Sequence, residues 1–108
     1  MKNVNDLIDL LNLEQIASNT FKGISKTIGS PNVFGGQVLA QALNAANRTV
    51  PEERILHSLH SYFLEAGKLE VPIIFIVEEM RDGGSFTTRR VKAMQNDVII
   101  FILAASFY

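Results

Sequence analysis

The stretch that decides the fold runs from Gly35 to Val50 and reads GGQVLAQALNAANRTV. Its apolar residues recur at helical spacing, and Pro51 prevents the helix from continuing. One face carries Leu39, Ala42, Leu43, Ala46 and Val50, and the polar stripe comprises Gln37, Gln41, Asn44 and Arg48. Because alanines at positions 40, 42, 45 and 46 keep the helix thin, another layer can approach it closely. The pattern predicts a buried central helix.

The residues before this helix predict shorter elements. Leu7 to Gln15 has helical spacing, with Asn5 or Asp6 available as a cap, and predicts a short surface helix. Thr20 to Ser25 predicts a brief strand. Gly29 to Asn32 is rich in residues that break regular structure and predicts a loop leading to the central helix.

The residues after Pro51 predict a run of strands, because β-branched and aromatic residues replace helix formers. The predicted strands are Ile55 to Leu64, Val71 to Met80, Ser85 to Met94 and Val98 to Phe107. Turn signals at Arg81 to Gly84 and at Asn96-Asp97 predict hairpins. The last three strands are therefore expected to be antiparallel neighbours.

This order of elements predicts the fold class. Strands that follow one buried helix indicate an α+β domain in which an antiparallel β-sheet covers that helix. A hotdog fold, an antiparallel β-sheet wrapped around a central α-helix, fits this order. The chain has 108 residues, a length that suits one hydrophobic core. Residues 1–108 are therefore expected to form a single hotdog domain.

The last strand carries a further expectation. Alternation places Val98, Ile100 and Ile102 on one face and Ile99, Phe101 and Leu103 on the other, so both faces are apolar. One helix covers one face of a sheet, and the other face then needs a cover of its own. A second hotdog unit, from another domain or another subunit, is the expected partner, and a dimer or larger assembly follows.

Composition excludes several classes of function. Ten Lys and Arg balance eleven Asp and Glu, so we expect no nucleic acid and no membrane as partners. The longest apolar runs are far shorter than the roughly 20 residues of a membrane-spanning helix. Asp6 and Asp9 interrupt the amino-terminal apolar run, which argues against an export signal and favours a cytoplasmic location. The chain has no cysteine, so thiol nucleophiles and thiolate metal sites are absent.

Phe34-Gly35-Gly36-Gln37 stands at the start of the predicted helix. Glycines there let a substrate approach the backbone, where unpaired N–H groups and the helix dipole favour developing negative charge. The oxyanion formed from a thioester carbonyl would suit this position. The alternative is that the two glycines only allow the loop to pack tightly against the helix.

The segment Leu56 to Tyr62 contains both histidines. Strand alternation places His57 with Ser61 on one face and Ser58, His60 and Tyr62 on the other. His57 and Ser58 are candidates for catalysis, although the carboxylate that a Ser-His triad needs is not evident. The alternative is that both histidines are hydrogen-bonded residues of the sheet. Two histidines without a third ligand do not predict a metal site, so none is expected.

Charged residues gather across one predicted hairpin. They are Glu78, Glu79, Arg81 and Asp82 on one strand and Arg89, Arg90 and Lys92 on the next. Cross-strand ion pairing is the ordinary explanation. The alternative is that Arg89 or Arg90 holds the phosphates of a nucleotide-like ligand.

Ordered blocks along nearly the whole chain closely resemble the amino-terminal repeat of the acyl-CoA thioesterase II family. The blocks are Phe34 to Leu43, Leu56 to Leu64, Arg81 to Gly83, Ser85-Phe86, Arg89 to Val91 and Ala105 to Phe107. Members of this family have two fused hotdog repeats and hydrolyse acyl-CoA thioesters to free fatty acid and coenzyme A.

The resemblance implies an incomplete catalyst. The second repeat of the family carries the Asp, the Ser or Thr, and the Gln that activate water, and none of them can be assigned in this chain. The implied substrate contacts are Phe34, Gly35, Gly36, Gln37, His60 and Tyr62. No cofactor is implied.

Two other functions fit the sequence less well. A non-catalytic acyl-CoA-binding or dimerisation module would explain why the start of the helix, Phe34 to Gln37, carries no carboxylate. A hydratase or dehydratase of acyl thioesters would need an Asp-His or Glu-His pair on the helix, and Gly35 to Gln41 contains neither.

Overall fold

The computed structural model describes residues 12–24, 31–68 and 71–108, and for residues 31–34 it describes the backbone alone. In chain order the elements are β1 (Glu14–Ala17), β2 (Thr20–Gly23), α2 (Pro31–Asn47), β3 (Leu56–Phe63), β4 (Ile73–Asp82), β5 (Thr87–Gln95) and β6 (Val98–Phe107). Among the described residues, no helix has the length and hydropathy needed to cross a bilayer.

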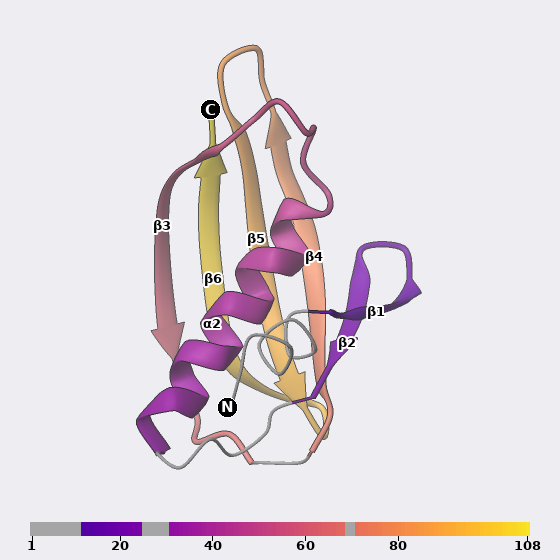
Figure 1. The fold of residues 1–108 in the computed structure, drawn as a ribbon, viewed down its shortest axis with the longest axis vertical. Coiled ribbons are helices and arrows are strands. Elements are labelled where there is room, and N and C mark those ends of the chain that lie inside the picture. The colour runs from indigo at the N-terminus through magenta and orange to yellow at the C-terminus, as the bar shows by residue number, and fades with distance from the viewer. Residues whose placement is uncertain (1–11, 25–30, 69–70) are drawn as a thin grey trace.

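The six strands form one antiparallel sheet in the order β1-β2-β4-β5-β6-β3. Helix α2 lies across one face of this sheet (Figure 1). The prediction that β4, β5 and β6 are antiparallel neighbours is confirmed. Asn96 and Asp97 both have positive φ, at 50° and 65°, which is the backbone of a tight type I′ hairpin.

The core lies between α2 and the sheet. Strand pairing aligns five inner-face residues across five strands, in the order Phe21, Phe75, Ala93, Phe101 and Phe63. The small residue, Ala93, lies on β5, the strand that α2 crosses (Figure 1). Ala42, Ala45 and Ala46 of α2 are fully buried. Small side chains on the helix and on β5 thus let the two layers pack closely, and the predicted buried central helix is confirmed.

Helix α2 begins and ends earlier than predicted. It spans Pro31–Asn47, whereas the sequence pattern predicted Gly35 to Val50 and a loop at Pro31-Asn32. Proline suits the first turn of a helix, where an N–H has no intrahelical acceptor anyway. At the other end, Thr49 and Val50 donate backbone hydrogen bonds to the carbonyls of Ala46 and Asn47 in tight turns outside the helix.

Gln37 and Gln41 of the predicted polar stripe are buried, and the carbonyl of Ile24 accepts a hydrogen bond from Gln41. One further expectation for the amino-terminal half is wrong. Glu14 and Gln15, assigned to the end of a surface helix, lie in β1 and pair with β2. Residues 7–11 of that predicted helix fall outside the described residues, and Asn12 and Leu13 are not helical.

We call the face of the sheet away from α2 the outer face. It is less apolar than the sequence of β6 predicted. Ala93 pairs with Phe101 and Met94 with Ile99, so Ile100 is an extra residue in β6 and is itself buried. Beyond this irregularity the neighbours of β6 that β5 contributes to the outer face are charged, with Lys92 opposite Ile102 and Arg90 opposite Ala104. The predicted simple alternation of β6 is therefore wrong at Ile100.

Candidate functional site

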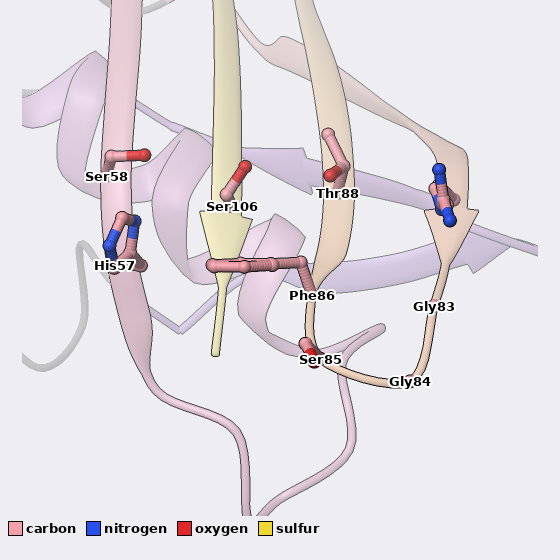
Figure 2. A pocket seen from close by; sticks show the side chains of 9 residues that line it. His57, Ser58, Gly83, Gly84, Ser85, Phe86, Thr88 and Ser106 are labelled. Carbon is pink, nitrogen blue, oxygen red and sulfur yellow. The ribbon is translucent and has the colours of Figure 1, made fainter.

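A hollow of about 670 Å³ opens beside the hairpin that joins β4 and β5. Its lining includes the turn residues 83–85 and six side chains, those of His57, Ser58, Arg81, Phe86, Thr88 and Ser106. Figure 2 shows the labelled side chains among them, those of His57, Ser58, Phe86, Thr88 and Ser106, on the side of the sheet opposite α2. We call it the outer hollow. Its volume falls within the roughly 300–1,000 Å³ that is usual for small-molecule sites.

An irregularity in β3 brings His57 and Ser58 to the same hollow. Leu56 pairs with Phe107 and Ser58 with Ser106, so His57 is an extra residue between two paired positions. Such a bulge re-aims the side chain next to it. The prediction that His57 shares a face with Ser61 rather than with Ser58 is wrong, because alternation does not hold across the bulge.

His57 and Ser58 nevertheless do not have the geometry of a hydrogen-bonded catalytic pair in the described part of the chain. The His57 ring contacts Phe86 edge-on, with ring centroids 5.3 Å apart. Among the described residues, neither the His57 nor the Ser58 side chain takes part in a hydrogen bond. The residues that line the outer hollow include no carboxylate. The arrangement lacks both the nucleophile-base contact and the group that would orient the base.

The predicted substrate contacts are spread over several surfaces. His60 and Tyr62 pair with Ala104 and Ile102 on the outer face, and neither lines the outer hollow. Gly35, Gly36 and Gln37 belong to α2, on the other side of the sheet. Phe34 is also in α2, and its side chain lies outside the described part of the chain. The described members of this predicted set do not line the outer hollow, and their role as substrate contacts stays a prediction.

The two glycines of α2 differ in their surroundings. A Cβ at Gly35 would lie 3.3 Å from the Phe63 ring, so this glycine allows β3 to approach the helix closely. A Cβ at Gly36 would meet nothing within 4 Å. Both positions lie beyond the first four residues of α2, whose amides are the ones without intrahelical acceptors. The expectation that Gly35 and Gly36 stand at the helix start is therefore wrong, and their contact with a substrate stays a prediction.

We expect Gly36→Ala to raise the free energy of unfolding by about 0.5–1 kcal/mol, because alanine is favoured over glycine inside a helix and here meets no neighbour. Urea denaturation of the two proteins measures the difference. Gly35→Ala serves as the matched control. Its free energy of unfolding should rise less, because the new methyl group presses on Phe63. A loss of stability at Gly36 would show that the backbone needs glycine there.

The charged cluster on β4 and β5 consists mainly of ion pairs. Arg90 Nε lies 2.7 Å from Glu78 Oε1, and this hydrogen bond lowers the pKa of the Glu78 carboxyl. Arg89 is buried and lies 2.9 Å from Asp82. The predicted cross-strand pairing is confirmed. Neither arginine offers a free guanidinium to a phosphate, because Arg89 is enclosed and Arg90 is paired with Glu78.

Comparison with known proteins identifies the family. The model of the acyl-CoA thioesterase N-terminal domain family matches residues 24–108. The chain belongs to this family. Acyl-CoA thioesterase 2 of Haemophilus influenzae is 50% identical over 104 residues, and human acyl-coenzyme A thioesterase 8 is 44% identical over 98 residues. The alignments cover 96% and 91% of this chain but 36% and 31% of those proteins, so the chain spans about a third of their length.

Solved structures agree with this membership. Acyl-CoA thioesterase II TesB2 from Mycobacterium marinum superposes with a TM-score of 0.85 and 45% identity, over 92% of this chain and 37% of that one. A protein described as having a hot dog fold, from Alicyclobacillus acidocaldarius, has a TM-score of 0.80 at 24% identity, over 94% of this chain and 39% of that one. The second likeness concerns the fold alone. The expected α+β hotdog architecture and the resemblance to the family's amino-terminal repeat are both confirmed.

Proposed function

We propose that this chain is the first hotdog unit of an acyl-CoA thioesterase and acts together with a second hotdog unit. In the proposed reaction, water attacks the thioester carbonyl, the C–S bond breaks, and free fatty acid and coenzyme A are released. The observation that carries the proposal is the match of residues 24–108 to this family, with 50% identity to a thioesterase that is much longer.

The described residues support the view that the chain is one part of the catalytic unit. The outer hollow has no lining carboxylate, and the described part of α2 carries no acidic residue. Neither place therefore offers a carboxylate as a general base for water, and His57 of the outer hollow has no carboxylate beside it in the lining to orient its ring. We therefore infer that the groups that activate water come from the second unit.

Strand β3 is the surface that best fits that second unit. It is a sheet edge, because β6 lies on one side of it and no described strand lies on the other. Tyr62 and Phe63 are 68% and 56% exposed there, and Leu64 follows them with its side chain also exposed. An apolar edge of this kind is normally covered by pairing. The outer face is less suited, because Arg90 and Lys92 interrupt it.

A chimera tests the function. The aligned 104-residue segment of the Haemophilus influenzae thioesterase is replaced with the matching residues of this chain, and thiol release from an acyl-CoA is followed with a chromogenic disulfide. We expect the chimera to keep at least roughly a tenth of the parent's kcat/KM, a loss of no more than about 1.4 kcal/mol in transition-state stabilisation. A folded but inactive chimera would refute the proposal.

The 108-residue chain alone is the control. It contributes no thiol background, because it has no cysteine, and we expect it to show no turnover. Clear turnover by the chain alone would contradict the division of catalysis between two units.

Light scattering on the same sample should give a dimer or larger species, held through β3. A monodisperse monomer would contradict the proposal that β3 pairs with a second unit.

A further inference from the structure

Four polar residues lie side by side across four neighbouring strands of the outer face. Strand pairing sets Ser58 of β3 opposite Ser106 of β6, Ser106 opposite Thr88 of β5, and Thr88 opposite Arg81 of β4. We call these four residues the polar row. Neighbouring strands are about 4.8 Å apart, so the row spans roughly 14 Å. Figure 2 shows the three hydroxyl side chains aligned at the outer hollow, and Arg81 also lines it.

The polar row is not used to hold the fold together. Among the described residues, the side chains of Ser58, Thr88, Ser106 and Arg81 take part in no hydrogen bond or ion pair with other residues. The other arginines do use their guanidinium groups within the fold, Arg48 on the Leu13 carbonyl, Arg54 on the 83–85 turn, Arg89 on Asp82 and Arg90 on Glu78. Arg81 therefore has its donors available to a ligand.

The turn beside the polar row is held in place from outside. Arg54 donates hydrogen bonds to the carbonyls of Gly83, Gly84 and Ser85. This contact fixes the wall of the outer hollow that lies next to Arg81. A preorganised wall reduces the entropy that a ligand would lose on binding.

Aromatic rings border the same hollow. Phe86 is 41% exposed, contacts His57 edge-on and lies with its ring centroid 5.2 Å from that of Tyr108. An exposed ring that neighbouring rings hold in place can stack on a planar base. The outer hollow therefore offers hydroxyl and guanidinium donors on one side and an aromatic surface on the other.

We propose that the outer hollow binds a phosphorylated nucleotide, with a phosphate on the polar row and the base against Phe86. Hydroxyl groups and a guanidinium without a carboxylate suit a phosphate, which accepts hydrogen bonds and carries negative charge. The nearby carboxylate of Asp82 pairs with Arg89, so it does not neutralise Arg81. The ligand is the nucleotide end of an acyl-CoA, which would rest on the proposed function, or a free nucleotide.

Calorimetric titration of the chain with adenosine 3′,5′-bisphosphate tests the site. Arg81→Gln should weaken binding about tenfold or more, as expected for loss of a charged hydrogen bond. Phe86→Leu should weaken binding of the bisphosphate but not of inorganic phosphate. Unphosphorylated adenosine should bind at least roughly tenfold more weakly than the bisphosphate. Circular dichroism confirms that each variant is folded.

Arg90→Gln is the matched control, because Arg90 is also an outer-face arginine but is paired with Glu78. It should change the affinity much less than Arg81→Gln. Equal losses in the two variants, or no binding of the bisphosphate at millimolar concentration, would overturn the proposal.

Titration with coenzyme A separates the two sources of the ligand. A Kd well below that of the bisphosphate indicates the nucleotide end of an acyl-CoA, and similar values indicate a free nucleotide. None of these titrations requires turnover, so a failed chimera leaves their result intact.

Discussion

Replacing Arg89 with alanine is expected to lower the free energy of unfolding by about 3 kcal/mol, at the low end of the range for breaking a buried ion pair. The guanidinium lies 2.9 Å from Asp82 and donates to the Thr49 carbonyl, also at 2.9 Å, while Nε donates to the Thr49 hydroxyl at 2.8 Å. Alanine removes all three contacts and leaves a void in the core. Because Asp82 is half exposed, water can solvate its carboxylate again, which limits the loss.

Two further variants separate these contributions in urea denaturation. Asp82→Asn removes the nearer ion pair but keeps the contacts to Thr49, and should cost less than about 1 kcal/mol because that carboxylate is half exposed. Arg89→Lys keeps a positive charge but cannot reach both partners at once, so it should fall between the two. A larger loss in Asp82→Asn than in Arg89→Ala would contradict this account. These contacts of Arg89 also matter for the site. They join Thr49, just after α2, to β5 beside Thr88 of the polar row.

The sequence predicted the fold where local signals and tertiary packing agree. Strand β6 was predicted with its observed ends, Val98–Phe107, because a turn at Asn96-Asp97 precedes it and its apolar run is continuous. Helix α2 was predicted to be buried because its alanines and leucines leave few polar positions. Its start was placed too late because Pro31 was interpreted as a residue that breaks helices, although a first helical turn accepts proline.

The candidate site was much harder to predict. The polar row joins residues that are far apart in the chain, and their alignment depends on pairing irregularities in β3 and in β4. Alternation alone places His57 on the wrong face. A bulge is defined by the pairing of two strands, so the sequence of one strand does not reveal it. Arg81, Thr88 and Ser106 were not singled out together for this reason. The available signal was the resemblance itself, since the blocks that carry it include Arg81 and Ser106.

Phe75→Ala is expected to lower the free energy of unfolding by about 3–5 kcal/mol, the usual cost of truncating a buried phenylalanine. Phe75 is fully buried in β4, between Phe21 and Ala93 on the inner face. The cavity cannot easily collapse, because its surroundings are already tight. A Cβ at Gly23 would lie 2.8 Å from Leu13 and 3.1 Å from the Phe75 ring.

The matched control for Phe75→Ala is Ile55→Ala, which also shortens a large apolar side chain. Ile55 is 70% exposed, so its loss should stay within about 0.5 kcal/mol, as is usual for surface positions. Urea denaturation compares both variants with the parent, and the slope of each transition shows whether unfolding stays two-state. Similar losses in the two variants would mean that the layer between α2 and the sheet does not carry the stability. Because that layer holds β4 and β5 in register, its failure would also remove the alignment on which the polar row depends.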